Sequence, residues 1–143
     1  MKTTNVFFLS ALLMLVCGCS RPQSEPESDD KVVKAVIVNE SEYEDVTSAL
    51  FVISEMKIEG DCLKIKIGSS GCSGSSWVAK LIAQEGIAKS NPPIRSVKLF
   101  LDNKELCQAF IAKEFAFDIE DLRVPDCNQV YLSISGKSIL YEY

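Results

Sequence analysis

The chain has 143 residues, of which 47% are hydrophobic, and it carries 15 Lys and Arg against 20 Asp and Glu, with no histidine. A chain of this length predicts a single domain. The net charge of −5 and the lack of a basic run argue against a nucleic-acid partner. The missing histidine excludes the usual Ser-His and Cys-His catalytic arrangements.

Residues 1–18 are expected to be a lipoprotein signal peptide. Lys2 provides a positively charged start, and the apolar stretch Val6–Val16 is too short to span a bilayer, which takes roughly 20 residues. The segment ends Val-Cys-Gly-Cys-Ser, which resembles the lipobox of bacterial lipoproteins. The resemblance implies that Cys19 is lipidated after cleavage behind Gly18. Several acyl chains on one cysteine would then give a stable membrane anchor.

The residues that follow the lipobox are expected to place the domain. Ser20 stands where an Asp would retain a lipoprotein at the inner membrane, so resemblance to Gram-negative lipoproteins implies the outer membrane. Residues 19–31 are acidic, hold two prolines and lack large apolar side chains, which predicts a disordered tether. Acidic residues behind the lipidated cysteine also resemble a surface-export signal of Bacteroidetes. The domain would therefore face either the periplasm or the cell surface.

Residues 32–143 are expected to form a β-sandwich domain. Short strands separated by turn signals predict an all-β, antiparallel sandwich of about seven strands, immunoglobulin-like or of a similar two-sheet architecture. The most regular strand is 62–68, where Leu63, Ile65 and Ile67 alternate with polar positions. No long helix is predicted, although a short helical turn could fall at 84–91 or 104–108. The other strands are expected at 32–38, 49–59, 76–84, 95–103 and 107–119, before a hairpin at 129–143 with Gly136-Lys137 in its turn.

Four cysteines remain after signal cleavage and lipidation, and an even number in an exported chain predicts two disulfides. The expected strand directions place Cys72 and Cys107 at one end of the sandwich, and Cys62 and Cys127 at the other. A bond between Cys62 and Cys72 is disfavoured, because the strand between them would carry the chain about 20 Å and bridged Cα atoms lie within about 7 Å. The predicted pairs are therefore Cys72–Cys107 and Cys62–Cys127.

The segment Gly68–Trp77, GSSGCSGSSW, raises the question of a nucleophile or a binding loop at Ser69–Ser76. Without histidine only a Ser-Lys pair is conceivable, and the spacing of these serines from the nearby Lys64, Lys66 and Lys80 matches no S-x-x-K motif. A G-x-S-x-G motif is also absent. We expect no catalytic residue here, but a flexible turn that Cys72 tethers. The sequence leaves open whether the tethered loop also contacts a ligand.

Two further groups of side chains have a candidate role. A hard cation such as Ca²⁺ could bind the carboxylates at the end of the domain, but their spacing lacks the D-x-D-x-D-G pattern, so no metal or cofactor is expected. An aromatic face could stack sugars, although Trp77 is expected in the core because it alternates with Ala79 and Leu81. The carboxylates are Asp118, Glu120, Asp121 and Asp126, and the aromatic residues are Trp77, Tyr131, Tyr141 and Tyr143.

Three stretches carry a resemblance: GDCLKIKIGSSGCSGSSWVAKLI, SNPPIRSVKLFLDNKELCQAFIAKEFAFDI and the final ILYEY, which together cover most of residues 57–143. They resemble a group of small Bacteroidetes lipoproteins of unknown function. The resemblance implies an anchored β-rich domain and supplies no activity. The expected function is a lipid-anchored envelope protein that acts as a non-enzymatic interaction or structural module, with an envelope protein or a glycan as its partner. The alternative is a sandwich that binds a small ligand or glycan.

Overall fold

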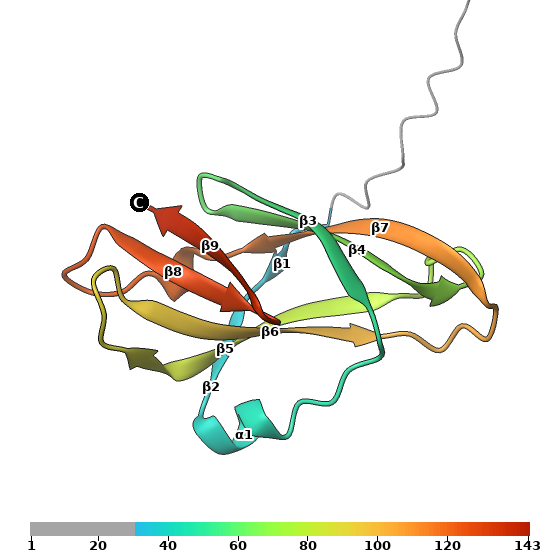
Figure 1. The fold of residues 1–143 in the computed structure, drawn as a ribbon, viewed down its shortest axis with the longest axis horizontal. Helices are drawn as coiled ribbons and strands as arrows, with labels where there is room; N and C mark the ends of the chain where they lie inside the picture. The colour runs from blue at the N-terminus through green and yellow to red at the C-terminus, as the bar shows by residue number, and fades with distance from the viewer. Residues whose placement is uncertain (1–30) are drawn as a thin grey trace, which may run out of the picture.

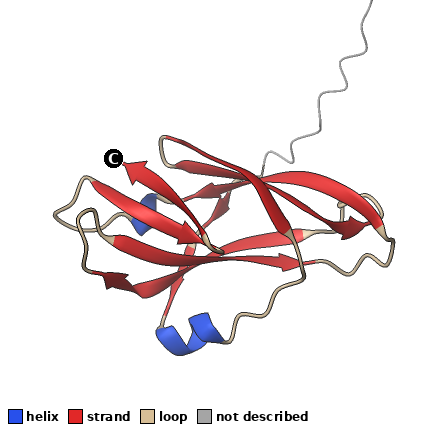
Figure 2. Cartoon of the chain, viewed as in Figure 1, coloured by secondary structure: helices blue, strands red, loops and turns tan. Residues whose placement is uncertain are grey.

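The computed structural model describes residues 31–143. The expected signal peptide, the lipidation site Cys19 and all but the last residue of the expected tether lie outside the described residues. Within them two β-sheets pack face to face, which confirms the all-β class (Figures 1 and 2). Sheet A has the order β1 (Val33–Lys34), β7 (Ala109–Asp118), β4 (Cys62–Gly71), β3 (Val52–Glu59). Sheet B has the order β2 (Val36–Val38), β5 (Val78–Ala88), β6 (Ile94–Asp102), β8 (Gln129–Ile134), β9 (Lys137–Glu142).

The strand expected at 32–38 is divided between the two sheets. β1 pairs in parallel with the end of β7, and β2 pairs in parallel with β5. The buried Ala35 lies at the crossing, where its N–H donates to Asp118 O at 2.9 Å. β6 and β8 are also parallel, because the chain crosses from sheet A to sheet B before β8 begins. The expectation of a purely antiparallel sandwich is therefore wrong, and both sheets are mixed.

The period-two pattern of the central strands is confirmed. Leu63, Ile65 and Ile67 of β4 are completely buried, and the two lysines between them lie on the outer face of sheet A. β6 alternates in the same way. Each fully buried leucine or isoleucine stabilises the fold by roughly 1.5–3 kcal/mol through the apolar surface it removes from water.

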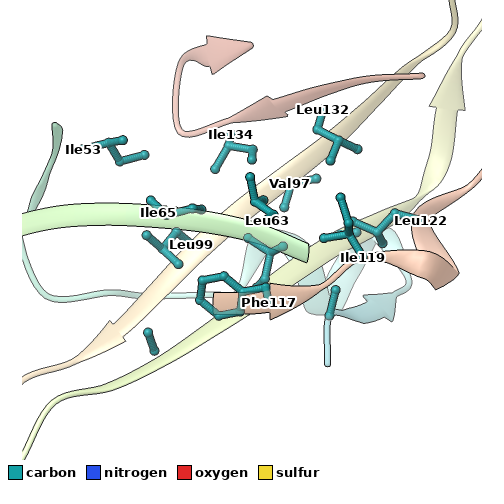
Figure 3. Packing of buried hydrophobic residues seen from close by; sticks show 14 of the residues in the cluster. Ile53, Leu63, Ile65, Val97, Leu99, Phe117, Ile119, Leu122, Leu132 and Ile134 are labelled. Carbon is teal, nitrogen blue, oxygen red and sulfur yellow. The ribbon is translucent and has the colours of Figure 1, made fainter. Parts of the chain in front are cut away.

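The core lies between the inner faces of the two sheets. Figure 3 shows Leu63 and Ile65 from sheet A close to Val97 and Leu99 from sheet B. Ile119 and Leu122 close one end of this core. Trp77, 4% exposed, also belongs to it. The core position expected for Trp77 is thus confirmed.

Helical structure occurs where the sequence predicts only connections. The helix α1 (Glu40–Glu44) follows β2, and its N-cap Asn39 accepts the Glu42 N–H at 3.0 Å, which is the usual role of asparagine at a helix start. A 3₁₀ turn, η1 (Glu120–Leu122), follows β7. The short turns considered at 84–91 and 104–108 are not helical: the first range is largely strand and the second has no regular structure. Neither helix of the described part is long and apolar enough to cross a membrane.

The C-terminal hairpin is confirmed, with a different turn. Ile134 pairs with Lys137, so the turn residues are Ser135 and Gly136 instead of Gly136-Lys137. Their φ angles of 47° and 85° are both positive, as a type I′ turn requires.

Candidate functional site

One disulfide joins two connections at the same end of the sandwich. The connection from β4 to β5 and the connection from β6 to β7 lie side by side there, on the right in Figure 1. The bond between Cys72 and Cys107 links them with a Cα–Cα distance of 4.9 Å. This pairing is the one that the expected strand directions predict. The disulfide therefore fixes the serine-rich loop against the 103–108 connection.

The second expected disulfide is not formed. Cys62 and Cys127 are both free thiols, Cys62 partly buried at the start of β4 and Cys127 exposed. Cys62 lies opposite Asp118, so the strand directions place the two cysteines at the correct end. After Asp118, however, the chain leaves sheet A through η1 and approaches β8 in sheet B. Strand direction sets the end of the sandwich at which a cysteine lies, but it does not set the sheet.

The serine-rich loop surrounds a carboxylate from the facing connection. The backbone N–H groups of Cys72, Ser73 and Gly74 all donate to Glu105 Oε2, the last two at 3.0 and 3.1 Å. The N–H and the hydroxyl of Ser76 donate to Glu105 Oε1 at 3.4 and 2.8 Å. These bonds favour the charged carboxylate, and they lower the pKa of Glu105 to about 2 despite a partial opposing effect of burial. The contact joins residues 29 to 33 positions apart.

Glycine is required where this loop begins. A Cβ on Gly71 would lie 2.6 Å from Glu105 Oε2 and 3.0 Å from the Trp77 ring, so the carboxylate and the indole meet where a side chain would be. Gly74 has a φ of +72°, which glycine adopts without strain. The glycines of GSSGCSGSSW therefore serve close packing and a tight turn.

The serines of this loop make structural hydrogen bonds. Ser73 Oγ lies 2.8 Å from Ser75 Oγ, Ser76 Oγ binds Glu105, and Ser69 Oγ donates to Leu50 O at 2.6 Å. Two of the three lysines considered as bases are engaged elsewhere: Lys64 pairs with Glu59 at 2.9 Å, and Lys80 lies over the Phe100 ring. The geometry thus gives no support to a Ser-Lys pair.

The carboxylates considered for a cation do not converge. Across residues 31–143, no group of three or more His, Cys, Asp or Glu is placed to hold a metal ion. Asp118 Oδ1 accepts the Glu120 N–H at 3.0 Å, and Asp121 pairs with Lys34 at 3.0 Å. These residues act in the local structure at the end of β7.

The aromatic residues considered for sugar stacking do not share an exposed face. Trp77 and Tyr141 are buried, and Tyr131 is exposed. Tyr143 packs against Tyr141 with the ring centroids 4.9 Å apart. The Tyr141 hydroxyl donates to Asp61, which also receives two bonds from Arg123 at 2.7 and 2.8 Å. This group ties the β3–β4 turn to the C-terminal strand.

A different aromatic ring is exposed, on the outer face of sheet A. Phe110 of β7 is 72% exposed, and its ring lies over Gly68 of β4, where a Cβ would collide with it. The ring borders a shallow groove of about 310 Å³ that crosses β3, β4 and β7. The other residues of this Phe110 groove are Val52, Ser54, Glu55, Lys66, Gly68 and Ala112.

The sequence does not single out Glu105 or Phe110. Phe110 is out of phase with Ile111, Phe115 and Phe117, and this offset is the signal that it faces outward. Glu105 has a weaker signal, its position two residues before Cys107. A carboxylate that accepts bonds from backbone amides leaves no motif in the sequence.

Comparison with known proteins shows solved structures with a similar fold. No protein-family model matches the chain, and no curated protein matches it significantly. A solved structure of a protein of unknown function DUF1344 from Bacteroides vulgatus ATCC 8482 is similar with a TM-score of 0.56 and 14% identity, over 78% of this chain and 56% of that one. A NigD-like immunity protein from Bacteroides caccae ATCC 43185 is similar with a TM-score of 0.51 and 7% identity, over 77% and 59% of the two chains.

These similarities define the class of protein at the level of the fold. The chain has a two-sheet fold that Bacteroides proteins of unknown or immunity-related description share. It matches less than three-fifths of the length of either neighbour. Neither neighbour is described as an enzyme.

Proposed function

We propose that the protein is a lipid-anchored, non-enzymatic interaction module of the bacterial envelope, and that it binds a protein partner through the Phe110 groove. The exposed Phe110 is the observation that carries this proposal. The lipobox-like segment ending at Cys19 supports the anchor, and the exposed Phe110 ring supports a binding face. The description of one structural neighbour as an immunity protein is compatible with a role in protein recognition.

Phe110 has the properties of a residue that anchors a complex. Covering a phenylalanine side chain removes apolar surface worth roughly 1.5–3 kcal/mol, and binding energy in interfaces concentrates in a few such residues. Val52, 63% exposed, adds apolar surface in the same groove. Lys66 adds a positive charge and Glu55 a negative charge beside it. An apolar centre with polar surroundings is the usual composition of a protein–protein interface.

The free edge of β7 favours an extended protein segment as the partner. β1 pairs only with Phe117 and Asp118, so residues 109–116 of β7 have no neighbouring strand on that side within the described part of the chain. An added strand could form main-chain hydrogen bonds there, which is a common way for domains to bind peptides. Its side chains would reach the outer face beside Phe110.

A small ligand or a glycan is the second candidate. The groove volume of about 310 Å³ is within the range of small-molecule sites, and one aromatic ring borders it. The groove is open, however, and Phe110 is its single aromatic residue. A protein partner agrees better with this geometry.

Affinity capture from intact envelopes tests the groove. The full chain is compared with Phe110→Ser, and with Val78→Ser as the matched control, because Val78 is 50% exposed on the other sheet. We expect one protein to be captured by the full chain and by Val78→Ser, and to be lost with Phe110→Ser. Capture that is equal for all three chains would contradict the proposal.

Membrane fractionation tests the anchor separately. Cys19→Ala should release the protein from the outer-membrane fraction into the soluble fraction, because the acyl chains would be missing. Cys17→Ala is the control and should leave the protein in the membrane. Retention of Cys19→Ala in the membrane would rule out the lipid anchor.

A further inference from the structure

The loop after β4 has the geometry of an anion-binding nest. Three consecutive N–H groups, from Cys72, Ser73 and Gly74, point at one oxygen, and the N–H and hydroxyl of Ser76 point at the other oxygen of the same carboxylate. Successive main-chain N–H groups that converge in this way form a concave site for an anion. The present occupant is Glu105, which belongs to a different connection.

Trp77 provides an independent donor at the same place. Its side chain is 4% exposed, and its Nε1 has no hydrogen-bond partner within residues 31–143. A Cβ on Gly71 would lie 3.2 Å from Trp77 Nε1 and 2.6 Å from Glu105 Oε2, so both groups border the same small space. A buried donor without a partner costs about 1–3 kcal/mol. An acceptor oxygen within hydrogen-bond distance of the indole nitrogen would satisfy it.

The nest and its occupant belong to different connections of the chain. Gly74 is buried in the connection from β4 to β5, and the Cys72–Cys107 disulfide ties this loop to the connection from β6 to β7. Glu105 lies in the 103–108 connection, which has no regular structure. Its neighbour Leu106 is 95% exposed, so it adds little packing that would hold the Glu105 side chain in the nest.

We propose that the loop Gly71–Trp77 is a carboxylate-binding site, which Glu105 occupies as a built-in ligand until the carboxylate of another molecule replaces it. A carboxylate fits because its two oxygens meet two separate sets of donors, three amides on one side and the Ser76 pair on the other. The incoming group would also accept the Trp77 N–H. The displaced Glu105 would move into solvent while its connection stays attached through Cys107. This site is distinct from the Phe110 groove and does not depend on it.

Acetate binding to Glu105→Ala, followed by NMR, tests the site. We expect the amide signals of Cys72, Ser73, Gly74 and Ser76 and the indole signal of Trp77 to shift together and to saturate, with an affinity at least tenfold higher than in the unmodified protein. Glu114→Ala, an exposed carboxylate on β7, is the matched control and should behave like the unmodified protein. Shifts that do not saturate, or that are equal in Glu114→Ala, would overturn the proposal.

Two further arms complete the experiment. If Glu105→Ala does not fold, the same titration is carried out on Glu105→Gln. Acetate should displace the neutral amide of the glutamine from the loop. A titration without a saturable shift would overturn the proposal. A short alanine peptide with a free C-terminus is then compared with its amidated form. Binding of the free form alone indicates the C-terminus of a partner chain, and binding of acetate alone indicates a small carboxylate. Either result supports the site, and binding of neither compound contradicts it.

Discussion

Glu105 shows how one side chain can hold two connections together. Its carboxylate takes five hydrogen bonds from the serine-rich loop, and these bonds lower its pKa to about 2. The charged form is therefore favoured in the folded protein relative to the unfolded chain. Stability from this group is fully present above a pH of about 4.5, the ordinary carboxyl pKa, and it is lost as the pH falls towards 2.

Glu105→Gln should remove this part of the acid sensitivity. We expect the unmodified protein to lose stability more steeply than the variant between pH 4.5 and pH 2, because only in the unmodified protein does unfolding take up a proton at Glu105. The measurement is the urea midpoint at several pH values. Glu114→Gln is the control and should follow the unmodified protein; a Glu105→Gln profile that coincides with it would refute the role of Glu105.

The buried residues were easier to predict than the exposed ones. Trp77 was expected in the core because alternation with Ala79 and Leu81 gives it an inner face, and the structure places it there. Phe110 lies on the outer face of sheet A. Alternation in β7 predicts that its side chain points away from the core, but it does not predict whether another part of the chain covers the ring. Glu105 depends on a contact between two connections, which no local pattern contains.

Arg95 joins η1 to β5. It is 4% exposed, and its Nε donates to Leu122 O at 3.2 Å while its Nη1 donates to Gln84 O at 3.0 Å. Leu122 belongs to η1, and Gln84 lies in the irregular part of β5 between Ala83 and Ile87. Burial lowers the pKa of Arg95, although the group stays charged at neutral pH.

Arg95→Met should destabilise the fold by about 2–4 kcal/mol, because at similar side-chain volume it leaves one buried and one partly buried carbonyl oxygen without their donor. Arg95→Lys should lose less, since one ammonium group can still reach one carbonyl. Urea unfolding measures both. Lys80→Met, on the exposed face of β5, should change stability by less than about 0.5 kcal/mol. Equal losses for Arg95→Met and Lys80→Met would contradict the role of Arg95.

The β8–β9 turn offers a stabilising substitution. Ser135 and Gly136 both have positive φ, and serine is less suited than asparagine to the first position of a type I′ turn. Ser135→Asn should therefore raise stability by about 0.5–1 kcal/mol. Thermal unfolding checks this, with Ser138→Asn, in β9, as the control. A gain in both variants, or a loss in Ser135→Asn, would argue against the assigned turn.

Strands with strict alternation were predictable, whereas short elements were not. β6 buries every second residue, and β4 does so from Leu63 to Ile67, so period two identifies both strands without the structure. The helix α1 has five residues and buries only Tyr43, which leaves too few apolar positions for a helical period. Asn39 caps the start of this helix, but an asparagine alone does not predict that a helix follows.

At the scale of the whole molecule, one disulfide closes a long segment of chain. Cys72 and Cys107 are 35 residues apart, and a closed loop of this length corresponds to about 4 kcal/mol from unfolded-state entropy, as an upper value. The bond also keeps the Glu105 connection beside the serine-rich loop. Cys62 and Cys127 add no such constraint, because both are free.

Two double variants separate these cysteines. Cys72→Ala with Cys107→Ala should lower stability by up to about 4 kcal/mol, whereas Cys62→Ala with Cys127→Ala should change it much less. Denaturation under non-reducing conditions measures both. A large loss in the Cys62 and Cys127 double variant would indicate that the second disulfide forms after all.

The two-sheet architecture was predictable, but the way the chain divides between the sheets was not. Hairpins follow from turn signals, which explains why the β8–β9 pair was expected. The crossing at Ala35 and the crossing after η1 depend on packing against the core. These two crossings produce the parallel pairs and separate Cys62 from Cys127.

The central claim is that the protein acts by binding a partner through the Phe110 groove. A photo-crosslinking amino acid at Ala112, inside the groove, and one at Lys80, on the other sheet, test this directly in intact cells. We predict a discrete protein adduct from position 112 that is absent from position 80 and disappears when Phe110→Ser is added. An adduct from position 112 that persists with Phe110→Ser, or the same adduct from both positions, would contradict the account.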